Sequence, residues 1–169
     1  AGVTVTVLEE KAYADGELIE VALDYFAQHR DGSVYYFGEL VDNFERGVLK
    51  DHHGQWLAGE GQNAAGIIMP VTPKVGETYA QEHAPGVAED QATVLSISEK
   101  VRVPVGTYAG CLKTKDFSPL DPGVMELKFY CPGVGMVKEE GDESILELTV
   151  LGAVPSAPAA ATTAAATAT

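Results

Sequence analysis

The two cysteines are the residues whose chemistry is easiest to read from the sequence. Cys111 and Cys131 are the only cysteines in the 169-residue chain. They fall on two predicted strands whose connection centres near Asp121. If the chain folds back there as a hairpin, Cys111 lies opposite Cys131 to within one or two residues. Cross-strand neighbours have Cβ atoms close enough for a disulfide. We therefore predict a disulfide between them, and the alternative is two unrelated buried thiols. The two cysteines lack the Cys-x-x-Cys spacing, which argues against a redox-active or metal-binding pair.

A cluster of imidazoles is the second candidate. Asp51, His52 and His53 are consecutive, and His83 lies in an acidic stretch of the sequence. Imidazole and carboxylate ligands of this kind bind copper or zinc. Adjacent residues of a strand point to opposite faces, so His52 and His53 could share one ion only on a turn, which Gly54 permits. A solvated polar turn is the competing interpretation.

No catalytic motif accompanies these residues. The acidic groups within 89–90 and 139–143 lack the repeating aspartate pattern of a calcium loop. The chain contains no Gly-x-Ser-x-Gly, no P-loop and no dinucleotide-binding glycine motif. The sequence therefore predicts a non-enzymatic protein and indicates no cofactor.

Large apolar side chains gather in the first half of the chain. Most of them are expected in the core, but a curved sheet could present some of them to an apolar ligand or to an interface. The candidates for such a surface are Tyr35, Tyr36, Phe37, Trp56, Ile67, Ile68 and Met69.

The elements around these candidates are predicted to be antiparallel strands. β-Branched and aromatic residues alternate with others over 3–13, 18–30 and 34–44, and Asp-Gly dipeptides at 15–16 and 31–32 separate these runs. Asp-Gly is the strongest short hairpin signal, because glycine accepts the positive φ that a type I′ turn requires.

The second half repeats this pattern after an interruption. Residues 59–73 contain three glycines and two prolines, so they are predicted to form a long loop folded over one edge or end of the sheet. Further strands are expected at 78–83, 92–97, 101–103, 106–117, 125–130, 136–140 and 145–151. The chain is thus predicted to be all-β, an antiparallel meander of about ten strands that forms a curved sheet, half-barrel or sandwich.

Composition limits the partners. Hydrophobic residues make up 46% of the chain and charged residues 21%, which is a globular balance, and the formal net charge is −14. Such a surface repels nucleic-acid phosphates and anionic lipid heads, and no apolar run is long enough to span a bilayer. We expect no nucleic-acid partner and no membrane span.

The domain is predicted to cover residues 1–152, and residues 153–169 form a low-complexity tail of mainly Ala, Thr and Pro. Tails of this composition serve as linkers or as O-glycosylated stalks outside the cell. Together with a first residue that is not Met, the tail predicts an exported protein of the periplasm, the cell surface or the extracellular space. It is also the expected site of self-assembly or of a protein partner, and its candidate O-glycosylation sites are Thr162, Thr163, Thr167 and Thr169.

Several strings in a fixed order resemble a family of exported bacterial proteins, most of them described as hypothetical proteins or lipoproteins. The strings occupy 34–39, 66–70, 79–82, 85–90, 111–114 and 130–135, and the resemblance extends over about residues 3 to 150. It implies an all-β exported domain and brings no catalytic residue with it. The family usually has Ala where this chain has Cys131, which favours a disulfide particular to this chain.

The Tyr-x-Pro-Gly-Val-Gly-x-Val-Lys stretch that begins at Tyr130 also resembles the last hairpin of curved half-barrel sheets that carry lipids or lipoproteins. The sequence as a whole favours an exported binding or structural module, as a subunit of an extracellular or envelope assembly. The alternatives are a carrier of an apolar ligand within a curved sheet and a metal-binding protein that uses His52, His53 and His83.

Overall fold

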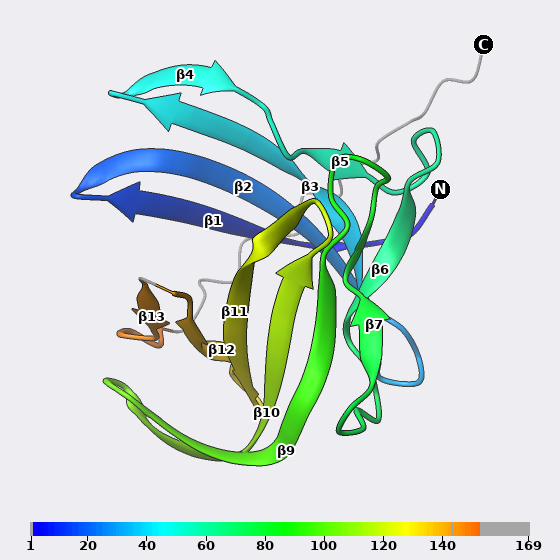
Figure 1. The fold of residues 1–169 in the computed structure, drawn as a ribbon, viewed down its shortest axis with the longest axis vertical. Helices are drawn as coiled ribbons and strands as arrows, with labels where there is room; N and C mark the ends of the chain where they lie inside the picture. Colours follow the sequence, from blue (N-terminus) through cyan, green and yellow to red (C-terminus); the bar gives the residue numbers. More distant parts are fainter. Residues whose placement is uncertain (1, 143, 153–169) are drawn as a thin grey trace.

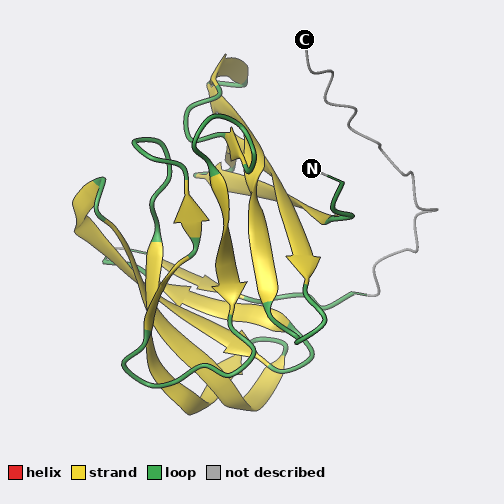
Figure 2. Ribbon diagram, turned by 90° about the vertical axis from the view of Figure 1, so that its right-hand side faces the viewer, coloured by secondary structure: helices red, strands yellow, loops and turns green. Residues whose placement is uncertain are grey.

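The structure is a computed structural model that describes residues 2–142 and 144–152, and these residues contain thirteen strands. The strands are β1 (Thr6–Ala14), β2 (Glu17–Gln28), β3 (Val34–Glu45), β4 (Val48–Asp51), β5 (Trp56–Leu57), β6 (Ala64–Met69), β7 (Thr78–Ala80), β8 (Glu82–His83), β9 (Gln91–Val103), β10 (Gly106–Ser118), β11 (Asp121–Cys131), β12 (Gly135–Glu140) and β13 (Ile145–Glu147). Figure 2 shows strands and loops throughout, with no helix in the described ranges. Accordingly, none of these residues belongs to a helix capable of crossing a membrane.

The strands form two antiparallel sheets. The first has the order β1-β2-β3-β6-β8, with β4 and β5 also paired to β3, and the second has the order β13-β12-β11-β10-β9-β7. Figure 1 shows the sheets diverging from the side of the molecule where β6 and β7 lie next to each other. Within the described residues the edge strands β1 and β13 do not pair, so the sheets do not close into a barrel. The prediction of an all-β curved sheet or sandwich is confirmed.

The first hairpin follows from its turn residues. Asp15 and Gly16 have φ angles of 51° and 83°, as the type I′ turn between β1 and β2 requires. Arg46 and Gly47, with φ angles of 53° and 75°, make the same kind of turn between β3 and β4. The Asp-Gly prediction at 15–16 is therefore confirmed.

The prediction of one long loop over 59–73 is wrong. Residues 64–69 form β6, which pairs with both β3 and β8. Pro70 comes directly after the strand, so it removes no hydrogen bond from the ladder. Gly66 has a packing role in the strand, because a Cβ there would lie 2.0 Å from the carbonyl oxygen of Gln81.

Two other predicted strands have different boundaries. The stretch 78–83 is divided at Gln81, so that β7 joins the second sheet and β8 joins the first. Gln81 is buried at this crossing, and its Nε2 donates to Asp116 Oδ2 of β10 at 3.1 Å. In contrast, the segments predicted at 92–97 and 101–103 belong to one continuous strand, β9. The division at Gln81 links the two sheets at the side where they meet.

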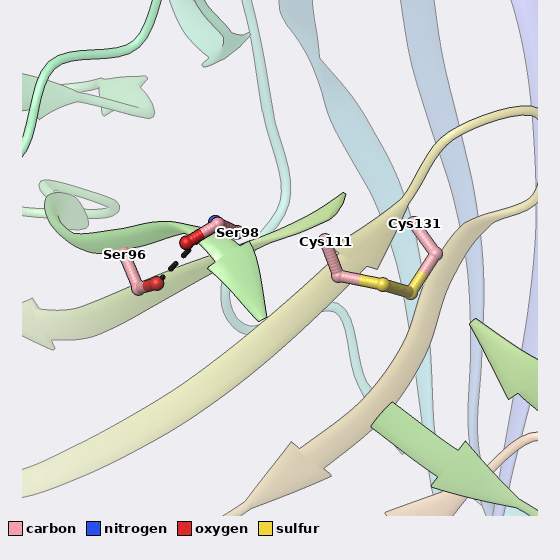
Figure 3. The surroundings of a disulfide bond; sticks show 4 residues. All are labelled: Ser96, Ser98, Cys111 and Cys131. Atoms are coloured by element: carbon pink, nitrogen blue, oxygen red, sulfur yellow. Dashed lines mark hydrogen bonds between the residues drawn. A yellow bond between two sulfur atoms is a disulfide. The ribbon is translucent and has the colours of Figure 1, made fainter. Parts of the chain in front are cut away.

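The predicted disulfide is present. Cys111 and Cys131 are bonded, with their Cα atoms 4.3 Å apart, and Figure 3 shows the bridge between β10 and β11. Because Leu112 pairs with Tyr130, the two cysteines stand directly opposite each other. Figure 3 also shows Ser98 N–H donating to Ser96 Oγ at 3.4 Å on the adjacent β9.

Two apolar clusters stabilise the sheets. One surrounds the disulfide and consists of Val101, Val103, Cys111, Phe129, Cys131 and Val137. The other belongs to the first sheet and its loops and consists of Tyr36, Trp56, Ala84 and Ala88. In this second cluster Tyr36 stacks on Phe26, with ring centroids 4.8 Å apart, and meets Trp56 edge to face at 5.5 Å. The candidate site lies between the two sheets.

Candidate functional site

A cavity of about 670 Å³, called the cleft below, lies between the two sheets. Strands β1, β2, β3, β6 and β8 line it from one side, and β10, β11 and β12 line it from the other. Much of the lining is apolar, including Phe26, Ile68, Met69, Leu112 and Met136. The size is in the range of pockets that bind small molecules.

One row of side chains crosses four strands of the first sheet. The register pairs Leu8 with Asp24, Asp24 with Glu39, and Glu39 with Trp56. Directly paired residues share a face of the sheet, with Cβ atoms about 4.5–5.5 Å apart. The carboxyl groups of Asp24 and Glu39 are therefore immediate neighbours in the lining of the cleft. Two like charges in this arrangement destabilise a sheet, unless a proton or a cation neutralises them.

A β-bulge produces this row. Asp24 pairs with Glu39 while Phe26 pairs with Tyr36, so β3 uses one residue more than β2 over the same length. The extra residue lies at 37–38, where Gly38 has a φ of 109° and a Cβ would lie 2.1 Å from the Trp56 carbonyl oxygen. Glycine is needed there for both the backbone conformation and the close approach of β5. The bulge brings Tyr36 and Glu39 to the same face.

Asp24 is a buried carboxylic acid with one satisfied oxygen. Its Oδ1 accepts a hydrogen bond from the Tyr36 hydroxyl at 2.6 Å. Its Oδ2 is buried and has no hydrogen-bond partner among the described residues. Burial raises the pKa of Asp24 above its usual range, and the Tyr36 hydrogen bond opposes this shift. A buried oxygen without a partner costs about 1–3 kcal/mol, which a ligand could recover.

Two further carboxyl groups in the cleft bind protons unusually tightly. Burial raises the pKa of Glu39 to about 8, and the neighbouring Glu82 and Asp24 add to the effect. Burial raises the pKa of Glu82 to about 7, with Asp90 adding to it. Carboxyl groups with such values near neutral pH concentrate at functional sites, although structural clusters also produce them.

The second sheet carries the opposite charge into the cleft. Lys128 Nζ lies 3.2 Å from Glu126, 3.6 Å from Glu139 and 3.7 Å from Asp116. Burial by itself would lower the pKa of Lys128, but Tyr130 and the three carboxylates outweigh it and raise this pKa. Lys128 is thus the centre of an ion network in its own sheet, and its charge is already matched.

The histidines lie apart from the cleft. His52 Nδ1 lies 2.9 Å from Asp42 Oδ1 and 2.8 Å from the Val41 carbonyl oxygen, while His83 is an exposed residue of β8. Asp51 Oδ1 accepts hydrogen bonds from Asn43 Nδ2 at 2.8 Å and from His53 N–H at 3.0 Å.

These contacts make Asp51 the organiser of a turn, and the hydrogen bonds from the His53 backbone and from Asn43 lower the pKa of its carboxyl. Asp51 and His53 also line a shallow surface hollow of about 560 Å³. No group of three or more His, Cys, Asp or Glu side chains in the described ranges is placed to hold a metal ion. The structure therefore does not bring His52, His53, His83 and Asp51 together as a metal site.

Three of the predicted apolar candidates line the cleft, namely Tyr36, Ile68 and Met69. Trp56 is buried against Tyr36. The ring of Tyr35 instead meets His29 edge to face at 6.2 Å, as expected for a residue adjacent to one that points inward. The candidates Phe37 and Ile67 belong to the same two strands, β3 and β6. Residues 153–169, including Thr162, Thr163, Thr167 and Thr169, lie outside the described residues.

Sequence reasoning missed the ionisable residues of the cleft. Asp24, Glu39, Glu82 and Lys128 attract no attention in a chain with 25 acidic residues. One signal was available, because Asp24 and Lys128 each interrupt a run of apolar and aromatic residues on a strand. A charged residue in such a run indicates either the solvent face or a buried polar site.

Comparisons with known proteins give no further guidance, since no family model matches the chain and neither a curated protein nor a solved structure is significantly similar to it.

Proposed function

We propose that this chain is an exported, non-enzymatic binding domain that holds a small ligand with an apolar body in the cleft between its two sheets. The observation that carries this proposal is the cleft itself, which combines a volume of about 670 Å³ with an apolar lining and a few converging polar groups. This combination is typical of small-molecule sites.

The exposure of apolar side chains at the cleft supports a ligand. Leu8 and Met136 line the cleft from opposite sheets and are 51% and 41% exposed. Each would lose apolar area to water if a ligand filled the space, at about 25 cal/mol per Å² buried. The cleft therefore offers a hydrophobic contribution to binding that the folded chain alone leaves unused.

The disulfide supports both the site and export. Cys131 lines the cleft, and its bond to Cys111 holds the adjoining strands β10 and β11 together. A rigid wall reduces the entropy lost when a ligand binds. Disulfides persist in oxidising compartments, which supports a location outside the cytoplasm.

The test uses a neutral fluorescent probe, N-phenyl-1-naphthylamine, whose emission rises in apolar surroundings. We expect saturable binding to the wild-type chain. The variant Met136→Trp places a larger side chain in the cleft and should weaken binding at least tenfold. The matched control is Met125→Trp, because Met125 is 43% exposed, nearly as much as Met136. Met125 lies in the first half of β11, whereas the cleft residues of that strand lie at 128–131, and it does not belong to the described cleft lining. Equal binding by both variants, or no saturable binding by the wild type, would contradict the proposal.

A further inference from the structure

The charges that line the cleft are unevenly distributed between its two sides. The first sheet contributes Glu10, Asp24, Glu39 and Glu82, and Asp90 follows β8. Among the described residues of the lining, Lys128 is the only basic one, and it lies within ion-pair distance of three carboxylates of its own sheet. One side of the cleft thus carries several acidic groups with no ion-pair partner among the described residues, although the charge of Lys128 acts on Glu10 and Glu82 from a longer distance.

Asp24 contributes to this side of the cleft a buried oxygen without a hydrogen-bond donor among the described residues. The residue is only 7% exposed, yet its Oδ2 has no hydrogen-bond donor anywhere in the described chain. No lysine, arginine or histidine nitrogen of the described residues forms an ion pair with Asp24, Glu39 or Glu82. Buried carboxylates normally have a hydrogen-bonding partner of opposite charge.

We propose that the ligand of the cleft is a cationic amphiphile, whose protonated amine binds between Asp24 and Glu39 while its apolar body packs against Phe26, Leu112 and Met136. This inference rests on the proposed function of the cleft as a binding site. The amine supplies N–H donors to the Asp24 and Glu39 oxygens, and its charge offsets the repulsion that arises when both of these directly paired residues are ionised. Glu82, whose carboxyl interacts electrostatically with that of Glu39, adds a third acidic group near the amine.

The chemistry of the lining favours an organic amine over an anion or a neutral ligand. A carboxylate or phosphate head would face Glu39 and Glu82 without a free cation in the described lining. A neutral alcohol could donate to one oxygen but would leave the acidic charges unmatched. A primary amine on an alkyl chain satisfies both the apolar and the acidic surface.

The experiment compares three probes with the same alkyl chain, namely octylamine, octan-1-ol and octanoate, by isothermal titration calorimetry at pH 7. We expect octylamine to bind at least tenfold more tightly than octan-1-ol, and octanoate to bind most weakly. Binding of the amine should also release about one proton, because Glu39 is largely protonated at this pH in the free protein and ionises against the ammonium group. Titrations in buffers of different ionisation enthalpy measure that release.

The variants Glu39→Gln and Asp24→Asn should reduce the preference for octylamine over octan-1-ol to less than threefold. The control is Glu17→Gln, an exposed residue of β2 at the end distant from Asp24, which should retain the preference. Glu39→Gln resembles the protonated side chain, so it tests the inference even if Asp24→Asn fails to fold.

The outcomes separate the two proposals. If none of the three probes binds, both the proposed function and this inference are overturned. If octan-1-ol or octanoate binds as tightly as octylamine, the cleft is a binding site but the inference is wrong. An amine preference that persists in both variants also overturns it, because the amine would then lie away from Asp24 and Glu39.

Discussion

The acidic side of the cleft predicts that the protein becomes less stable as the pH rises from 5 to 8. In the folded chain burial raises the pKa of Glu39 to about 8 and that of Glu82 to about 7. In the unfolded chain both groups have ordinary values of about 4.3. Between these limits the folded state binds more protons than the unfolded state, so the free energy of unfolding falls with rising pH. The stabilising effect is complete below pH 4 and is lost above the folded-state pKa values.

The size of the effect follows from the linkage relation. A group that is protonated when folded and ionised when unfolded lowers the free energy of unfolding by about 1.4 kcal/mol per pH unit. From pH 5 to 7 this amounts to about 2.7 kcal/mol for Glu39, and about half of that once its contact with water is taken into account. Glu82 contributes a similar amount, so we expect a total loss of about 2–3 kcal/mol. The pKa values of Asp31 and Asp51 are lowered, so these two groups change the free energy of unfolding only below this pH range.

The assay is urea unfolding at pH 5, 6, 7 and 8, followed by the fluorescence of Trp56, the single tryptophan of the chain and a buried one. Glu39→Gln should flatten the pH dependence by about 1.4 kcal/mol between pH 5 and 7 and raise the stability at pH 8. Glu17→Gln should follow the wild type. A wild-type stability that is constant or increases over this range would refute the reasoning, as would a Glu39→Gln variant with an unchanged slope.

Three other perturbations test the fold. Replacing Cys111 and Cys131 by Ala should cost about 3 kcal/mol, from the loop entropy of a 20-residue separation, and lower Tm by about 6–12 °C in calorimetry. Gly66→Ala should cost about 3 kcal/mol or more in urea unfolding, because its Cβ would overlap a backbone carbonyl oxygen in the neighbouring segment. Lys128→Met should cost about 3 kcal/mol at pH 7 by leaving three carboxylates without their cation. The cost should be smaller at pH 5, because burial raises the pKa of Asp116 and of Glu139, and their protonation reduces the repulsion.

Each of these three predictions has a matched control. The wild type in reductant should match the double alanine variant, and a difference would mean that the lost packing matters more than the bond. Gly123→Ala is the control for Gly66→Ala, since no atom of the described chain lies within 4 Å of a Cβ there. Lys100→Met removes an exposed lysine of β9 and should leave the stability unchanged. If Lys100→Met and Lys128→Met are equally stable, the network around Lys128 contributes nothing.

Local patterns predicted much of the architecture. The Asp-Gly turn at 15–16 and the alternating residues on either side identified the first hairpin, because a type I′ turn depends only on its own residues. The disulfide was predictable for a similar reason: a hairpin folded near Asp121 brings Cys111 and Cys131 opposite each other. The strand β6 was missed because its glycine and flanking prolines resemble a loop, although Pro70 lies outside the ladder.

The candidate site could not be predicted in this way. Tyr36 and Glu39 are three residues apart, so strict alternation places them on opposite faces of β3, and only the bulge at 37–38 brings both into the cleft. Asp24 and Glu39 meet because of the register between two strands, which depends on the bulge and on the packing of β5 against Gly38. None of these constraints is visible in the stretches that contain the residues.

The sequence alone determined that this chain is a β protein with tight turns and a disulfide, since those features arise from neighbouring residues and from the symmetry of one hairpin. The tertiary structure decided which charges meet. It grouped Asp24, Glu39 and Glu82 on one side of the cleft and matched Lys128 with the carboxylates of the other. Burial and the distance to other charges determine whether a carboxyl group is a solvated surface residue or a binding group, and both depend on segments far apart in the chain.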